Sequence, residues 1–410
     1  MRTTCVIAGS GPAGAMLALL LGRAGVDVTL LEKHGDFLRD FRGDTIHPST
    51  LQVIDELGLS AEFHRMPHHQ MSYMSVSDGR AMRPVADLRR LPGKYRYIAF
   101  VPQWDFLDLI VGHARRNPNL RVLMNAEVTG VITEKGAVRG VHYRDAAGDH
   151  EIRAALTVAA DGRGSVVRRA AGLRPKDFGA PMDVVWFRLP RTADDVTEPF
   201  LRFDAGAGMV AINREAYWQL AYLIPKGGFA ALRARGIAEF REDIGEMIPF
   251  LADRARNLAS FDDTSVLSVV VDRLPRWYLP GLLCIGDAAH AMSPIAGVGI
   301  NLAVQDAVAA ANLLAGPMVR AERSRRPVLD PMPASLLARV QRRRLPPAAI
   351  TQALQLRVQN QTIGPMLAGR RPRMPRVVSP VRRHLAGRLI GLGIRPEHVR
   401  PEFRSERSSQ

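Results

Sequence analysis

The feature that most constrains the fold is a glycine-rich turn between an apolar run of β character and a predicted helix at the N-terminus. Gly9, Gly11 and Gly14 follow the apolar run with the spacing Gly-x-Gly-x-x-Gly. Glycines at these positions allow a tight turn, a close approach of the backbone to a pyrophosphate, and close packing of the helix on the strand. A second apolar strand, predicted at residues 26–31, leads to Glu32, where a carboxylate can accept hydrogen bonds from an adenosine ribose. This β-α-β unit predicts a Rossmann-type α/β fold for a dinucleotide, either FAD or NAD.

The length and the composition allow a folded enzyme of two connected domains. The chain has 410 residues, of which 47% are hydrophobic and 23% charged, as in ordinary globular proteins. Its two cysteines, Cys5 and Cys284, each lie in a short apolar run, which favours two buried thiols in a reducing compartment over a disulfide. No convincing signal peptide and no run of about 18 uncharged apolar residues occurs. These features predict a cytoplasmic protein.

The charge of the chain is strongly positive, with a formal net charge of +16 from 56 lysines and arginines against 40 acidic residues. Much of the excess is arginine in the C-terminal quarter, at Arg342, Arg343, Arg344, Arg370, Arg371, Arg382 and Arg383. Because no aromatic residues are interleaved with these arginines, we expect a solvated basic face and no nucleic-acid partner. Association with an anionic membrane surface through this region is an open alternative, but it is not the favoured one.

The order of the predicted elements indicates two interleaved domains followed by helices. Strand-like segments in the middle of the chain, with a hairpin turn at Ser77-Asp78-Gly79-Arg80 and a helical insertion at 229–251, predict a separate antiparallel sheet. The predicted boundaries are 1–70, 99–180 and 272–320 for the dinucleotide-binding domain, 71–98 and 181–271 for the substrate domain, and 321–410 for a C-terminal helical region.

Two further motifs follow predicted strands later in the chain. The first is Ala160-Asp161-Gly162-Arg163-Gly164-Ser165, with Arg168 after it. The second is Ile285-Gly286-Asp287-Ala288-Ala289-His290, after which Pro294, Gly297, Gly299 and Asn301 lead into a helix predicted at 302–314. Each motif therefore stands where a strand ends and a helix or turn begins, as the first motif does.

The three motifs, in this order, resemble those of the p-hydroxybenzoate hydroxylase family, the FAD-dependent aromatic hydroxylases also known as group A flavoprotein monooxygenases. The resemblance covers most of the chain. It implies a p-hydroxybenzoate hydroxylase-like α/β fold, with a Rossmann-type FAD-binding domain, an interleaved antiparallel-sheet substrate domain and C-terminal helices. It also implies that Asp287 meets the ribityl chain of FAD, that the helix start near Gly299 faces the flavin ring, and that Asp161 is associated with FAD and the nicotinamide cofactor.

Less specific matches extend the site that the resemblance implies. Arg42, in Phe41-Arg42-Gly43-Asp44, would approach the cofactor, although a surface ion pair is an alternative for it. Gln103 would contact the flavin, and the backbone at Val128 would lie near the adenine. The implied cofactor-binding residues are Gly9, Gly11, Pro12, Ala13, Gly14, Glu32, Lys33, Arg42, Gln103, Val128, Asp161, Gly162, Gly286, Asp287, Pro294, Gly297, Gly299, Ile300 and Asn301.

The sequence departs from the family pattern at one position. Val298 stands where the hydroxylases usually have glutamine, so the polarity near the flavin is expected to differ. Asn301 fits the hydroxylases better than the related geranylgeranyl-type reductases. The Trp-x-Trp-x-Ile-Pro segment of flavin-dependent halogenases is missing from the sequence.

The resemblance implies a reaction in which NADPH or NADH reduces FAD, molecular oxygen forms a flavin C4a-hydroperoxide, and an aromatic or polycyclic small molecule is hydroxylated. The positive charge tilts the nicotinamide preference mildly toward NADPH. No metal site and no catalytic side chain are indicated. His47, His290, Tyr217 and Tyr222 are more readily structural than catalytic. An aromatic pocket could be lined by Trp186, Phe187, Phe203, Tyr217, Trp218 and Tyr222, although core packing explains most of these equally well, and Trp277 is expected in the core or in a pocket lining. A flavin-dependent dehydrogenase or reductase, a halogenase-like enzyme, and a non-catalytic flavoprotein or basic interaction module stay open, as do the substrate and the oligomeric state.

Overall fold

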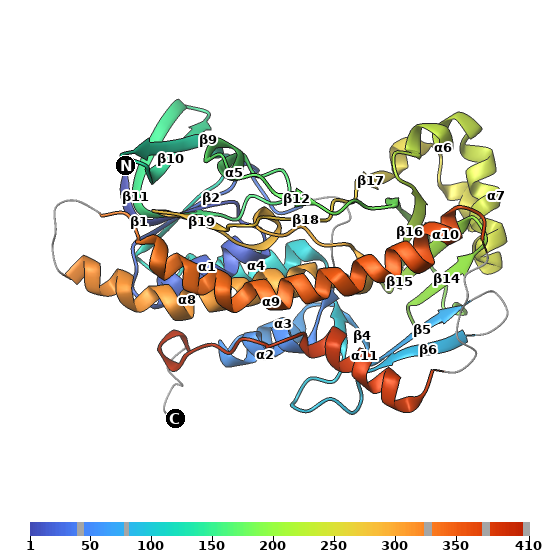
Figure 1. The fold of residues 1–410 in the computed structure, drawn as a ribbon. Coiled ribbons are helices and arrows are strands. Elements are labelled where there is room, and N and C mark those ends of the chain that lie inside the picture. The colour runs from blue at the N-terminus through green and yellow to red at the C-terminus, as the bar shows by residue number, and fades with distance from the viewer. Residues whose placement is uncertain (39–44, 78–81, 324–329, 371–377, 405–410) are drawn as a thin grey trace.

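The computed structural model describes residues 1–38, 45–77, 82–323, 330–370 and 378–404. Within these residues the chain forms two large sheets at opposite ends of the molecule, with long helices running between them (Figure 1). The predicted α/β architecture, with parallel and antiparallel sheets and C-terminal helices, is confirmed.

The N-terminal β-α-β unit consists of β1 (Arg2–Ala8), α1 (Pro12–Arg23) and β2 (Val28–Leu31). Pro12 occupies the start of α1, where its missing N–H removes no intrahelical hydrogen bond. Residues 13–22 of α1 are all buried, which explains why the helix is apolar on every side rather than on one face.

The first large sheet contains the parallel strands of the dinucleotide fold. Its strand order is β19 (Tyr278–Leu279), β20 (Leu282–Cys284), β11 (Gly148–Ala159), β1, β2 and β8 (Leu120–Leu123). Since β1 pairs in parallel with β2 and β11, and β11 with β20, the carboxyl ends of these four strands meet at one edge. A ribbon of β9 (Glu127–Glu134) and β10 (Ala137–Asp145) extends β11, and β10 was not predicted from the sequence.

The second large sheet joins segments that lie far apart in the sequence. Its order is β17 (Ser265–Leu267), β13 (Met182–Pro190), β16 (Tyr217–Pro225), β15 (Ala207–Asn213), β14 (Phe200–Asp204), β5 (Tyr73–Ser77) and β6 (Met82–Asp87). The helical insertion, α6 (Phe229–Arg235) and α7 (Ile237–Met247), covers one face of this sheet. Phe187, Trp218 and Tyr222 lie in the core beneath these helices, whereas Trp186 packs with residues of the other face and is half-buried.

Smaller elements connect the two sheets. They are β3 (Thr45–Ile46), β7 (Ile98–Phe100) and β4 (His69–Met71) in one sheet, β12 (Lys176–Asp177) and β18 (Asp272–Arg273) in another, and the helices α2 (Pro48–Glu56), α3 (Ser60–Arg65), α4 (Gln103–Ala114) and α5 (Val166–Ala170). Helices α1 and α4 share one hydrophobic core with α8 (Gly299–Arg323).

The C-terminal helices pack on both large sheets and their helices, more extensively than we expected from the sequence. α8 continues through Pro317, after which we expected only a helical appendage. Behind it follow α9 (Ala334–Val358), α10 (Gly364–Leu367) and α11 (Pro380–Leu392). α9 packs on α8 and crosses the molecule toward the second sheet, which α10 contacts (Figure 1).

The expected solvated basic face is wrong for one of its arginines. Arg342, Arg370 and Arg382 are exposed, but Arg344 is only 1% exposed and its Nε lies 3.0 Å from Oδ1 of Asp306. A fixed carboxylate in α8 supplies the charge partner that lets this guanidinium be buried. Arg371 lies outside the described residues.

Two further expectations concern burial. Cys5 and Cys284 are confirmed as buried, unbonded thiols, and burial raises the pKa of both well above its usual value. The stretch 295–323, which includes α8, is long and apolar enough by composition to cross a membrane, but 83% of its most apolar window is buried inside the protein. In this fold it is a core helix.

Candidate cofactor-binding site

The three sequence motifs meet at the carboxyl edge of the parallel sheet. Gly9 follows β1, Glu32 follows β2, Asp161 follows β11 and Gly286 follows β20. Ligands of open α/β sheets bind at this edge, because the loops and helix starts there are free to face them. The topology therefore brings together motifs that lie more than a hundred residues apart in the sequence.

The three glycines of the first motif have different surroundings. Gly9 has a φ of +93°, and a Cβ there would lie 2.6 Å from the carbonyl oxygen of Ala160. A Cβ on Gly14 would overlap the carbonyl oxygen of Gly9. A Cβ on Gly11, in contrast, would meet no atom within 4 Å. Gly9 and Gly14 are thus required by packing, while Gly11 leaves open space at the start of α1, where an anion is favoured.

The carboxylate of Glu32 is fixed against this turn. Glu32 is 2% exposed, and its two oxygens accept hydrogen bonds from the backbone N–H groups of Ser10 at 3.0 Å and His34 at 3.1 Å. A carboxylate has further lone pairs, so it can also accept hydrogen bonds from a ribose. Its neighbour Lys33 is exposed.

The first and third motifs touch each other. Gly286 has a φ of +58°, and a Cβ there would lie 3.0 Å from the Cβ of Ala13 and 3.4 Å from that of Ala303. The side chain of the following residue, Asp287, is 35% exposed, and one oxygen lies 3.9 Å from the guanidinium of Arg163. Asp287 is therefore accessible to a ligand at the junction of α1 and α8.

The start of α8 is anchored to the segment before α2. Both polar atoms of the Asn301 side chain are engaged within the protein: Oδ1 accepts from the His47 N–H at 2.9 Å and from the Thr50 hydroxyl at 2.7 Å, and Nδ2 donates to the Thr45 carbonyl at 3.3 Å. The open positions are at the backbone, since a Cβ on Gly299 would meet no atom within 4 Å. This end of a long helix favours negative charge.

The second motif carries a buried acceptor without a partner. Oδ2 of Asp161 accepts from the Val167 N–H at 3.1 Å, whereas Oδ1 is buried and has no hydrogen-bond partner in the described structure. Burial raises the pKa of Asp161. Gly162 has a φ of +81° and open space at its Cβ position. An unsatisfied buried oxygen beside open space fits a ligand that supplies a donor.

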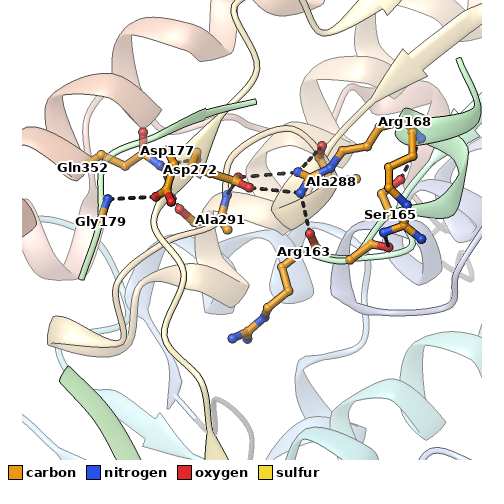
Figure 2. Close-up of polar contacts among 11 residues, drawn as sticks. Arg163, Ser165, Arg168, Asp177, Gly179, Asp272, Ala288, Ala291 and Gln352 are labelled. Atoms are coloured by element: carbon orange, nitrogen blue, oxygen red, sulfur yellow. Dashed lines mark hydrogen bonds and ion pairs between the residues drawn. The ribbon is translucent and has the colours of Figure 1, made fainter. Parts of the chain in front are cut away.

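A buried ion pair joins the second motif to the third. The guanidinium of Arg168 lies 3.0 Å from the carboxylate of Asp272 and donates to the Ala288 carbonyl at 3.2 Å (Figure 2). Asp272 also accepts from the Ala291 N–H at 3.3 Å. Arg168 could be identified in the sequence but Asp272 could not, because no fixed spacing links a strand-end aspartate to a motif so far away.

The remaining predicted residues are spread around this edge. Gln103 begins α4 and is half-buried, and Val128 lies in β9 and is 8% exposed. Pro294 precedes a turn at Ile295–Gly297, in which a Cβ on Gly297 would overlap the Thr45 hydroxyl. Ile300, in the first turn of α8, is 7% exposed. Arg42 lies outside the described residues.

His47, which precedes α2, is fully buried and binds α11, which packs on α2. Its Nδ1–H donates to the Ile390 carbonyl at the end of α11, at 2.7 Å. Burial lowers the pKa of His47 to about 4, although the hydrogen bond to Ile390 opposes that shift. The imidazole is therefore neutral in the folded protein at neutral pH and serves as a structural donor.

Because His47 is buried in its neutral form, we expect the folded protein to lose stability in acid. Because the folded pKa of His47 is depressed, its stabilising effect is complete above about pH 6.5 and is lost as the pH falls to about 4. The unfolded chain takes up a proton in that window and the folded protein does not. We expect His47 to account for about 3 kcal/mol of the decrease in unfolding free energy. Denaturant unfolding at pH 7 and pH 4.5 should show a clearly smaller decrease for His47→Asn, and equal decreases in both proteins would contradict this.

Comparisons with known proteins agree with this geometry. The model of the family described as FAD binding domain matches residues 2–330. A 6-methylpretetramide 4-monooxygenase of Streptomyces rimosus is 35% identical over 388 residues, which cover 92% of this chain and 89% of the relative. Among solved structures, P. aeruginosa PqsL in complex with 2-aminobenzoylacetate has a TM-score of 0.74 at 21% identity, over 90% of this chain and 98% of that one. The flavin-dependent brominase Bmp2 has a TM-score of 0.76 at 20% identity, over 95% and 94% of the two chains. These two likenesses concern the fold.

Proposed function

The chain belongs to the FAD-binding-domain family of flavoproteins, and from this premise we propose that it is a monooxygenase that hydroxylates an aromatic or polycyclic small molecule with FAD, NAD(P)H and molecular oxygen. The observation that carries the proposal is the convergence of three FAD motifs at one edge of the parallel sheet, in a chain that is 35% identical to a monooxygenase along 92% of its length.

The residues present fit FAD. The open side of Gly11 at the start of α1 suits the pyrophosphate, and the fixed carboxylate of Glu32 suits the adenosine ribose. The partly exposed carboxylate of Asp287 suits hydrogen bonds from the ribityl hydroxyls, and the open space at Gly299 suits the flavin ring. The unsatisfied oxygen of Asp161 fits a contact to FAD or to the nicotinamide cofactor.

The bound flavin would supply the redox chemistry, accepting hydride from NAD(P)H and activating oxygen. The protein's part is to bind, orient and exclude water. The start of α8, where the first N–H groups of a helix have no intrahelical acceptor, stabilises negative charge at the place proposed for the ring. The described residues offer no side chain to which a proton transfer can be assigned on geometric grounds.

We place the substrate against the second sheet, on the face that α6 and α7 do not cover. Trp186 and Val210 are half-buried on that face and pack against the cluster that contains Phe100 and Ile212. Apolar and aromatic side chains of this kind bind flat aromatic ligands. We propose that residues 71–98 and 181–271 form the substrate domain. We also propose that the protein works in the cytoplasm with NADPH as the reductant.

Removal of the Asp287 carboxylate should weaken the binding of FAD. Asp287→Ala should raise the dissociation constant for FAD about tenfold or more, because an acceptor for the ribityl hydroxyls is lost. The fold should persist, since the side chain is 35% exposed and its ion pair is 3.9 Å long. Titration of apoprotein with FAD, followed by flavin fluorescence, measures the change. Asp149→Ala, at the far end of β11 with a 70% exposed side chain, is the control. An unchanged affinity in the Asp287 variant would remove this residue from the site.

Rapid-mixing absorbance tests the reaction. Flavin-loaded protein is mixed with NADPH, with and without a panel of phenolic and polycyclic aromatic ligands. The proposal predicts that at least one ligand greatly accelerates flavin reduction. Reduction that is indifferent to every ligand would favour a flavin-dependent dehydrogenase or reductase instead, and a brominated product formed in the presence of bromide would favour a halogenase.

A further inference from the structure

The loop that connects β20 to α8 is held by side chains of α9. This loop, residues 286–297, contains Asp287 and leads to the proposed flavin-facing end of α8. The match to the family model ends at residue 330, before α9 begins. We infer that α9 fixes part of the cofactor site, and that Gln352 and Gln355 of α9 are positioning residues for the 286–297 loop. This inference rests on the proposed placement of FAD.

The side of α9 that faces the loop is polar and buried. Five polar residues along α9 and the turn after it are separated by three, eight, three and four positions, which are close to one or two helical turns, so they project from one side of the helix. They are Gln341 (9% exposed), Arg344 (1%), Gln352 (1%), Gln355 (5%) and Gln359 (0%). A helix side in a core is normally apolar, and buried amides are found where they have specific hydrogen-bond partners.

Gln355 binds the second half of the loop. Its Nε2 donates to the carbonyl of Ser293 at 2.9 Å and to that of Ile295 at 2.8 Å. The next residue, Ala296, has a φ of +62°, in the left-handed region that a residue with a Cβ rarely adopts. Such a turn persists only where its surroundings fix it. The amide of Gln355 fixes the carbonyl directly before it.

Gln352 binds the first half of the loop. Its Nε2 donates to the carbonyls of Ala291 and Asp272, each at 2.8 Å, and Figure 2 shows these three residues together. Its Oε1 accepts from the Arg273 guanidinium at 2.8 Å. The single side chain therefore holds the loop to the strand that carries the Asp272 partner of Arg168. Together, Gln352 and Gln355 supply donors to the loop carbonyls of Ala291, Ser293 and Ile295.

Arg344 acts on the same loop through another residue. Its Nε lies 3.0 Å from Oδ1 of Asp306, while Oδ2 of Asp306 accepts from the Gly286 N–H at 3.1 Å and lies 2.6 Å from Nε2 of His290. The beginning of the loop is thus fixed by a carboxylate that α9 neutralises. Side chains of α9 therefore hold both ends of the loop and its middle, either directly or through Asp306.

A matched pair of substitutions tests the inference. Gln355→Leu removes both hydrogen bonds that the Gln355 amide donates to the loop, and leucine keeps a similar side-chain volume. Gln359→Leu removes a buried glutamine from the same region, but the amide of that glutamine donates to the Gly179 carbonyl at 3.1 Å instead of to a carbonyl of the loop. Each full-length protein is freed of FAD, its thermal unfolding midpoint is measured, and it is then titrated with FAD.

We expect both substitutions to lower the unfolding midpoint of the apoprotein, but only Gln355→Leu to raise the FAD dissociation constant, about tenfold. Gln359→Leu should stay within about twofold of the unsubstituted protein. A purely structural role would move the midpoint alone, so equal dissociation constants in the two variants would overturn the inference. If Gln355→Leu does not fold, Gln352→Leu replaces it, with the same expectation and the same contradicting result.

The outcome separates this inference from the proposed function. If the unsubstituted chain does not bind FAD, or if Asp287→Ala leaves its affinity unchanged, the proposed placement of FAD is wrong and the inference fails with it. If Asp287→Ala weakens binding while Gln355→Leu and Gln352→Leu do not, the FAD site stands and only the role of α9 is refuted.

Discussion

A Gly11→Asp protein is expected to fold as the unsubstituted chain does and to bind FAD at least about 100-fold more weakly. The fold should persist because a Cβ at Gly11 meets no atom within 4 Å. Binding should fail because the new carboxylate would stand at the start of α1, where the account places the pyrophosphate. Two unit charges about 4 Å apart repel by about 4 kcal/mol at an effective dielectric constant of 20, which exceeds the loss predicted here.

The comparison with Gly14 makes this result specific. A Cβ at Gly14 would overlap the carbonyl oxygen of Gly9, so Gly14→Ala should lower the yield and stability of the folded protein itself. Gly11→Asp should instead purify as a stable, colourless protein. Circular dichroism and FAD titration distinguish the two cases. A Gly11→Asp protein that retains yellow, stoichiometric FAD would show that the pyrophosphate does not bind at this turn.

Arg344→Met is expected to cost about 3–5 kcal/mol of unfolding free energy, the usual cost of removing one partner from a buried ion pair. Asp306 is 0% exposed, and burial opposes its charge, but His290 and Arg344 together hold its pKa below the usual range. Glu397 is also fully buried and lies 3.6 Å from Arg344. Methionine fills a similar space but leaves Asp306 without its guanidinium and Glu397 with Arg343 alone.

Arg343→Met is the control for this substitution. Arg343 binds the same Glu397, at 2.7 Å, but its side chain is 38% exposed, so we expect a clearly smaller loss in urea unfolding. The double variant Arg344→Met with Asp306→Asn should recover part of the stability, because it removes one of the unpaired charges. A loss below about 1 kcal/mol for Arg344→Met would mean that this network does not hold α9 to α8.

The parts of the fold that the sequence predicts well are those in which local pattern and tertiary position agree. The β1-α1-β2 unit combines a buried apolar strand, fixed glycine positions and a proline at the helix start, and the order of the motifs after parallel strands places them at one edge. The β10 strand was missed because Ala137–Asp145 mixes charged and apolar residues, and its register shifts against β9, at Val138/Gly140 and His142/Tyr143, break the two-residue alternation of buried positions.

The contribution of α9 could not be predicted from the sequence. Arg342, Arg343 and Arg344 are adjacent and chemically identical, yet only the third is buried, because the partners that decide it, Asp306 and Glu397, come from distant segments. The glutamines of α9 have the same property: a buried glutamine and an exposed one look alike until the carbonyls that they bind are placed in space.

The most direct test of the account is the fate of molecular oxygen. The flavin-loaded protein is supplied with NADPH, oxygen-18 gas and the polycyclic phenol that most accelerates flavin reduction, and the product is analysed by mass spectrometry. We expect a product that carries one oxygen-18 atom, formed with the consumption of one NADPH. A product oxidised or reduced without any oxygen-18 would contradict the monooxygenase assignment and make the chain a dehydrogenase or reductase built on the same FAD-binding fold.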